Sequence, residues 1–104
     1  MLFVTYWELN EAIPVEERHG ITETLTGSGT FPPDGVEVLR WDSTTDMWGI
    51  VVWEAEDIGA INDGLTVWRA SGAGFFEETK TAPAAPVEEF LTRQAALLEE
   101  LPGR

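Results

Sequence analysis

Few residues of this chain could do proton-transfer or anion-binding chemistry. His19 is the only histidine, and imidazole suits general acid–base catalysis near neutral pH. Arg18 precedes it and Arg40 lies further along the chain, and a guanidinium can hold a carboxylate or a developing oxyanion. Each residue also has an ordinary explanation. His19 can be a surface residue, and Arg18 can be an amphipathic side chain that pairs with Glu8.

Tryptophan is the unusual component of the composition. Five are present among 104 residues, at positions 7, 41, 48, 53 and 68. Aromatic walls with a few convergent polar groups are typical of small-molecule pockets. The alternatives are core packing for Trp7 and Trp68, and a cross-strand aromatic pair for Trp41 and Trp48.

The composition excludes several classes of function. Six Lys+Arg against nineteen Asp+Glu give a net charge of −13, which disfavours nucleic acid and anionic membrane surfaces as partners. Without cysteine there is no disulfide framework or thiol nucleophile, and one histidine is too few for a His-rich metal site within one chain. No phosphate-binding glycine loop or nucleophile elbow is present. We therefore expect no metal and no cofactor, and the lack of a signal-like start or long apolar run predicts a cytoplasmic protein.

Hydrophobic patterning predicts the elements that position these residues. The first and third predicted strands are apolar on both faces, which favours central places in a sheet, whereas the charged fourth strand suits an edge. A turn is expected at residues 30–35 and a stiff linker at 82–86, dividing a domain of residues 1–82 from a C-terminal segment of residues 83–104. Strands are predicted at residues 2–9, 36–42, 47–54 and 75–81, and helices at about 14–26, at 57–71 and from about 86 onward.

This order of elements predicts an α+β fold of the ferredoxin-like βαββαβ type, with an antiparallel sheet in the order 4-1-3-2 and an extra C-terminal helix. Two helices can cover only one face of such a sheet. The other face still carries apolar residues, so we expect a homodimer in which a second copy packs sheet to sheet. The alternative is that the C-terminal helix covers part of that face or braces the dimer.

Several short motifs carry a resemblance to a known family. These are FPPDGV at 31–36, LRW at 39–41 and VWEAED at 52–57, followed by Trp68 and by Phe76-Glu77. With them, the first 82 residues or so resemble a small domain-of-unknown-function family of the dimeric α+β barrel superfamily. The resemblance implies a ferredoxin-like protomer that is usually dimeric, with relatives that include cofactor-free antibiotic-biosynthesis monooxygenases, cyclases, isomerases and haem-degrading enzymes. Asp42 follows Trp41 where many relatives have a histidine.

The predicted topology gathers most of the chemistry-bearing residues at one end of the sheet. The ends of the first two strands, the start of the first helix and the end of the second helix all meet there, and only Trp53 among the tryptophans lies at the other end. We expect His19, Arg18 and Arg40 to supply catalytic groups there. The expected ligand-binding residues are Tyr6, Trp7, Trp41, Trp48, Trp68, Arg69 and Phe75. The sequence does not fix which face of the sheet Tyr6, Trp41 and Trp48 occupy.

Three functions fit these residues. The first is a small enzyme without a redox cofactor, of monooxygenase, cyclase or isomerase type, acting on an aromatic or polycyclic substrate; His19 would move a proton, and Arg18 or Arg40 would hold an oxyanion. The second is a non-catalytic binder of an aromatic or apolar small molecule in the same pocket. The third is an interaction protein that docks a partner through its C-terminal helix.

Overall fold

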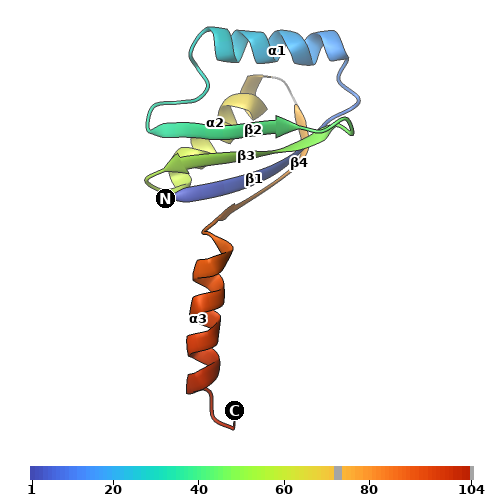
Figure 1. The fold of residues 1–104 in the computed structure, drawn as a ribbon. Helices are drawn as coiled ribbons and strands as arrows, with labels where there is room; N and C mark the ends of the chain where they lie inside the picture. The colour runs from blue at the N-terminus through green and yellow to red at the C-terminus, as the bar shows by residue number, and fades with distance from the viewer. Residues whose placement is uncertain (72–73, 104) are drawn as a thin grey trace.

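The computed structural model describes residues 1–71 and 74–103 (Figure 1). Four strands and three helices follow one another in the order β-α-β-β-α-β-α, as the sequence predicts. The elements are β1 (Leu2–Leu9), α1 (Val15–Gly27), β2 (Val36–Ser43), β3 (Trp48–Ala55), α2 (Ile58–Ser71), β4 (Phe76–Pro83) and α3 (Val87–Glu100). No helix in the described ranges combines the length and the apolar character needed to cross a bilayer.

The strands form one antiparallel sheet in the order β2-β3-β1-β4, which reads 4-1-3-2 from the β4 edge. The central strands are β1 and β3, the two that are apolar on both faces, and the charged β4 lies at an edge. The domain is therefore α+β, with a sheet compatible with a ferredoxin-like fold.

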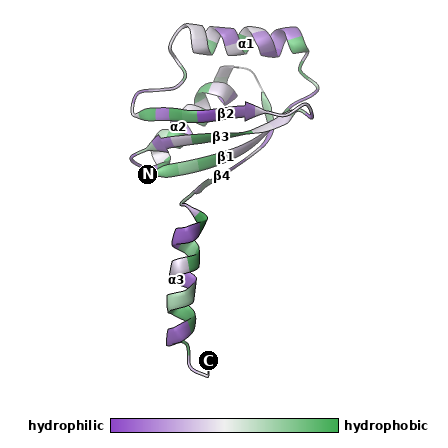
Figure 2. Cartoon of the chain, viewed as in Figure 1, coloured by the Kyte–Doolittle hydropathy of each residue, from purple (hydrophilic) through white to green (hydrophobic). Residues whose placement is uncertain are grey.

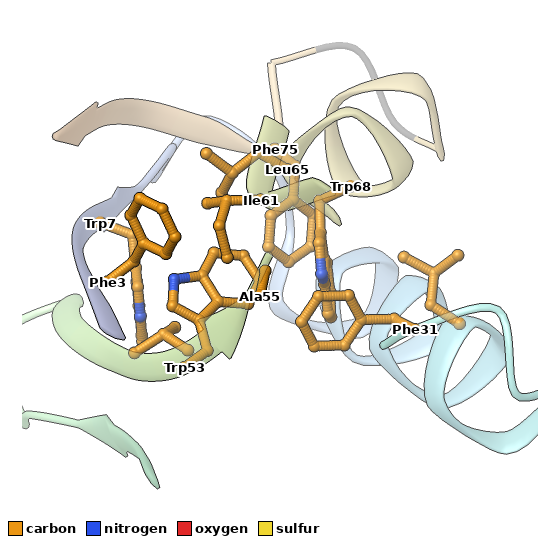
Figure 3. Packing of buried hydrophobic residues seen from close by; sticks show 11 residues of the cluster. Phe3, Trp7, Phe31, Trp53, Ala55, Ile61, Leu65, Trp68 and Phe75 are labelled. Atoms are coloured by element: carbon orange, nitrogen blue, oxygen red, sulfur yellow. The ribbon is translucent and has the colours of Figure 1, made fainter. Parts of the chain in front are cut away.

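The hydrophobic core lies on the sheet face that α1 and α2 cover (Figure 3). Phe3, Thr5 and Trp7 of β1 alternate inward, and Trp53 of β3 pairs with Phe3 across the strands. Thr5 is the one buried polar residue in the described part of the chain. Its hydroxyl accepts a hydrogen bond from Trp53 Nε1 at 3.1 Å and contacts Thr81 Oγ1 at 2.8 Å. This chain of bonds satisfies polar groups that burial would otherwise leave unpaired.

Residues 30–35 connect α1 to β2, in the place where a turn was predicted, but Phe31 is a core residue. Its side chain is 4% exposed and its ring centroid lies 5.3 Å from those of both Trp41 and Trp68. The loop therefore carries an anchor of the aromatic core, which its turn-like composition conceals.

A β-bulge interrupts each edge strand. In β2, Val38 pairs with Trp53 and Arg40 pairs with Val52, so Leu39 is the extra residue. In β4 the register shifts beside Leu9, which pairs with Phe76, and Glu77 is the extra residue. A bulge reverses the alternation of side chains, so residues on one side of it occupy the opposite face from the one that strict alternation would give them. The two bulges thus turn Trp41 and Phe76 to the helix-covered side.

Several predicted boundaries differ from the structure by one or two residues, and two of the differences have a clear cause. Met47 does not begin β3, because its φ of 65° places it in the turn before Trp48. Residues 82 and 83 do not begin the linker, since they pair with Val4 and Phe3 and belong to β4.

The helix α3 projects away from the sheet and has no buried residue (Figure 1). The radius of gyration is 17.4 Å, against about 13 Å for a compact domain of this length. The last helix therefore packs on none of the elements that form the core.

Candidate functional site

An open pocket of about 300 Å³ lies between the N-terminal half of α1, the C-terminal ends of β1 and β2, and the start of β4. Four aromatic side chains form most of its wall, and Arg18 and His19 of α1 supply the charged and titratable groups. The lining residues are Trp7, Leu9, Val15, Arg18, His19, Thr22, Trp41, Ser43, Phe75 and Phe76.

The two bulges build the aromatic wall. Trp41 pairs with Val51, a buried core residue, and so faces the helices. Without the extra Leu39, strict alternation would put Trp41 on the opposite face of the sheet. In the same way, the extra Glu77 places Phe76 beside Leu9 on the pocket side. The pocket is therefore a consequence of irregular pairing, which a period-two pattern does not reveal.

Glycine at position 49 gives the Trp7 indole its place. Gly49 pairs with Trp7 across β1 and β3. A Cβ atom added at Gly49 would overlap Cζ2 of Trp7 and the carbonyl oxygen of Asp42, and would lie 2.8 Å from Cε2 of Trp7. Only a residue without a side chain lets this edge of the indole lie flat on the strand.

The Trp7 indole N–H is an unsatisfied donor. Trp7 is 6% exposed, and its Nε1 atom is buried with no hydrogen-bond partner among the residues that the structure describes. Trp53, the other deeply buried indole nearby, donates to Thr5. An unpaired buried donor costs free energy, and this one lies on the indole edge that packs against the strand at Gly49.

The polar side of the pocket comes from one turn of α1. Arg18 Nε donates to the carbonyl oxygen of Ile13 at 3.1 Å, which fixes the side chain across the start of the helix. The expected pairing of Arg18 with Glu8 is wrong, because Glu8 alternates with Thr5 and Trp7 and lies on the other face of the sheet. The ion pairs within residues 1–71 and 74–103 do not include Arg18.

His19 lies at the exposed rim of the pocket. Its Nε2 atom is 2.9 Å from Glu23 Oε1, one helical turn further along, and both side chains are 71% exposed. A carboxylate in this position directs Nε2 of the imidazole toward Glu23 and leaves Nδ1 as the other ring nitrogen. This arrangement can move a proton to or from a group bound beside α1.

Trp68 lies behind the pocket wall instead of lining it. It is 2% exposed and its ring contacts Trp41 and Phe75 edge-on or tilted, with centroids 5.5 and 5.0 Å away. Trp68 therefore supports the two aromatic residues that line the pocket. Trp7 and Trp68 were both expected as ligand-binding residues; both are buried on the helix-covered side of the sheet, but only Trp7 lines the pocket.

The structure does not bring the remaining predicted site residues to this pocket. Tyr6 and Trp48 lie together on the opposite face of the sheet, with ring centroids 5.7 Å apart. Arg40 is on that face too and pairs with Asp42. Arg69 is exposed, and its Nη2 donates to Thr79 Oγ1 at 2.6 Å.

Carboxylates on the opposite face perturb one another. A side-chain hydrogen bond with Glu78, helped by partial burial, raises the pKa of Glu8 above its ordinary value. Partial burial, together with the neighbouring Glu8 carboxylate, raises the pKa of Tyr6. The two glutamates face each other across β1 and β4.

Sequence reasoning missed five of the lining residues. Leu9, Val15, Thr22, Ser43 and Phe76 were not among the expected site residues. Ser43 and Phe76 were missed because a bulge separates each of them from the regularly paired part of its strand. Val15 and Thr22 could have been found, since they lie three residues before and four residues after Arg18, on one side of a helix.

No known family model matches this chain, and a search of curated proteins finds no match either. The pocket must therefore be interpreted from its own geometry.

Proposed function

We propose that this protein binds a small aromatic molecule with an anionic group in the pocket beside α1. The observation that carries the proposal is the combination, in one cavity, of four aromatic walls with a single arginine that has no acidic partner among the described residues.

The volume favours a ligand of one or two rings. A buried cavity of about 150 Å³ holds a benzene molecule, and this pocket has about twice that volume. Ligand pockets generally begin at about 300 Å³, so the site is at the small end of that range. A polycyclic substrate would extend past the rim at His19.

Arg18 favours an anion. In a chain with a net charge of −13, general electrostatics would repel an anionic ligand, so binding requires a local cation. A charge-assisted hydrogen bond contributes about 1.5–3 kcal/mol, or roughly 10- to 150-fold in affinity. We expect Arg18→Gln to lower the affinity for an aromatic carboxylate by that factor while leaving the neutral carboxamide unaffected.

The tryptophans themselves provide the assay. Each of the five indole N–H groups gives its own cross-peak in a ¹H–¹⁵N spectrum. Titration with 2-naphthoate should shift the Trp7 and Trp41 peaks saturably. The Trp48 peak should stay in place because Trp48 is on the opposite face of the sheet. 2-Naphthamide is the matched neutral probe for the Arg18 contribution.

Two variants control this experiment. Trp41→Leu should abolish binding, whereas Trp48→Leu changes the same residue type outside the pocket and should leave it intact. If neither probe shifts the Trp7 and Trp41 peaks, or if only the Trp48 peak moves, the proposed binding site is refuted.

The rim position of His19 favours a second, catalytic role. We infer that the His19–Glu23 pair transfers a proton to or from the bound molecule, as in a cofactor-free monooxygenase, cyclase or isomerase. For any molecule that the protein binds and converts, His19→Gln should retain binding and lose turnover by about 10²-fold or more. Full turnover in that variant would show that His19 takes no part in the reaction, and the catalytic role proposed for it would be refuted.

A further inference from the structure

Within the part of the chain that the structure describes, no element covers the sheet face opposite the pocket. Its central strip consists of three residues of β1 and three of β3, all of them half-buried and apolar or aromatic: Leu2, Val4, Tyr6, Trp48, Ile50 and Val52. We call this set the central strip. It is two strands wide, or about 10 Å, which is the diameter of one α-helix with its side chains.

The outer strands of the same face are charged. On β2, Arg40 and Asp42 form an ion pair there, and on β4, Glu78 and Lys80 lie 3.7 Å apart at their nearest charged atoms. Packing two such faces directly on each other would remove these groups from water, which is costly for charges. A single helix laid along the central strip would leave them hydrated.

The chain carries a helix of that kind without a partner. Along α3 and its C-terminal end, apolar residues repeat at helical spacing: Val87, Phe90, Leu91, Leu97, Leu98 and Leu101. We call this set the α3 stripe. Five of its six members are between 52% and 66% exposed, and Figure 2 shows hydrophobic segments interspersed with hydrophilic ones along the projecting helix.

The connection to β4 directs α3 away from its own sheet. The Ala84 N–H donates to the Leu2 carbonyl at 2.9 Å, so the chain is held in line with β4 to that point. Ala85 precedes a proline, which disfavours a helical conformation, and Pro86 is extended with ψ at 141°. The helix thus begins beyond the end of the sheet, and a sharp reversal would be needed to cover the strip of the same chain.

We propose that two copies of this chain form a closed dimer in which the α3 stripe of each copy lies along the central strip of the other. Helix pairing alone would leave both sheet faces bare, and sheet pairing alone would leave both helices bare. Reciprocal exchange covers both central strips and both α3 stripes, and a single two-fold axis relates the two copies.

The dimensions and the area agree with this exchange. A helix of 14 residues is about 21 Å long, and strands of eight residues are about 26 Å long. Side chains exposed to this extent present roughly 100 Å² of accessible surface each, so the five most exposed members of one α3 stripe contribute about 500 Å². With the strip it covers, each of the two contacts buries about 1,000 Å², and the dimer reaches the range of about 1,200–2,000 Å² found in stable interfaces.

The lack of cysteine makes a cross-linking test clean. Ile50→Cys marks the middle of the central strip, and Gln94→Cys marks the middle of the helix face that carries the α3 stripe without removing an apolar side chain. The two single variants are co-expressed, one with a tag that changes its mass, and treated with a short bismaleimide. We expect a tagged-to-untagged product that joins position 50 of one chain to position 94 of the other, in a particle with the mass of two chains.

The control places the thiol on the far side of α3. Ala96→Cys lies on the polar face, two residues from position 94, and should cross-link to Ile50→Cys at least 10-fold less. A predominant 94–94 product would show helix-to-helix pairing, a predominant 50–50 product would show sheet-to-sheet pairing, and a monomer or an open filament by light scattering would show neither. Each of those results overturns the exchange, and none bears on the pocket, which is on the other face.

Discussion

Replacing Gly49 with alanine tests whether the Trp7 indole is held where the structure places it. An added Cβ would overlap both Cζ2 of Trp7 and the main-chain oxygen of Asp42. The oxygen belongs to β2, which is paired with β3, so it cannot retreat without breaking the register. The indole would have to leave its place instead, although Trp7 is only 6% exposed.

The size of the effect follows from overpacking. Inserting a methyl group into a well-packed core costs about 1–3 kcal/mol and occasionally more. The added methyl group of Gly49→Ala would clash with two groups, one of them main chain. We therefore expect the free energy of unfolding to fall by the upper end of this range, about 3 kcal/mol. For a domain of this length, this lowers the melting temperature by roughly 12–24 °C.

Gly20→Ala is the matched control, because the same change should have the opposite sign. A Cβ at Gly20 meets nothing within 4 Å, and Gly20 lies within α1. Alanine in a helix is favoured over glycine by about 0.8–1 kcal/mol, so the melting temperature should rise by roughly 3–8 °C. Both are measured by calorimetry. If Gly49→Ala melts at or above the parent temperature, the position of Trp7 and the pocket wall built on it are refuted.

Three further results are expected. Thr5→Val keeps the shape of the side chain but removes the acceptor of the Trp53 N–H, so the free energy of unfolding in urea should fall by about 1–3 kcal/mol; Thr81→Val leaves that acceptor in place and should cost less. The pKa of Glu8 is raised in the folded state. Protonated Glu8 therefore stabilises the fold at pH values below the ordinary pKa of a glutamate, and this stabilisation is lost as the pH rises through the raised pKa. Glu78→Gln should therefore increase the melting temperature at pH 7, and a gain that persists near pH 3 would contradict the assigned cause. Finally, a dimer of chains that each carry −13 should tighten as salt rises above about 0.1 M, and sedimentation that shows weakening would argue for ion pairs at the interface.

The sequence predicts the framework of this domain well, because the framework depends on periodicity. The two-sided apolar patterns of residues 2–9 and 47–54 indicated central strands, and the strands formed there, β1 and β3, are both central. The apolar spacing along α2 indicated that Trp68 faces the core, and it is 2% exposed. These inferences hold because a strand or helix without interruptions presents its faces at a fixed period.

The candidate site was predicted only in part, since it depends on departures from periodicity. Trp7, Phe75, Arg18 and His19 were expected in one place and line one pocket. The facing of Trp41 could not be decided, because a bulge is a single extra residue with no strong signature of its own in the sequence. Tyr6 was expected there too, but it belongs to the central strip on the opposite face, because regular alternation along β1 puts Tyr6 and Trp7 on opposite faces.

The bulges also explain why the two faces of the sheet are suited to different tasks. By turning Trp41 and Phe76 toward the helices, they concentrate aromatic surface in the pocket and leave the edge strands of the opposite face with mainly charged side chains. Only the central strip remains apolar there, and its width fits one helix. The pocket is at the end of β1 that leads to α1, whereas α3 leaves from the other end, beside Leu2. Binding and assembly therefore use separate residues. A charged side chain in the middle of the central strip, as in Ile50→Glu, should reduce the particle to the mass of one chain without changing its affinity for 2-naphthoate, whereas the small thiol of Ile50→Cys should leave the dimer intact.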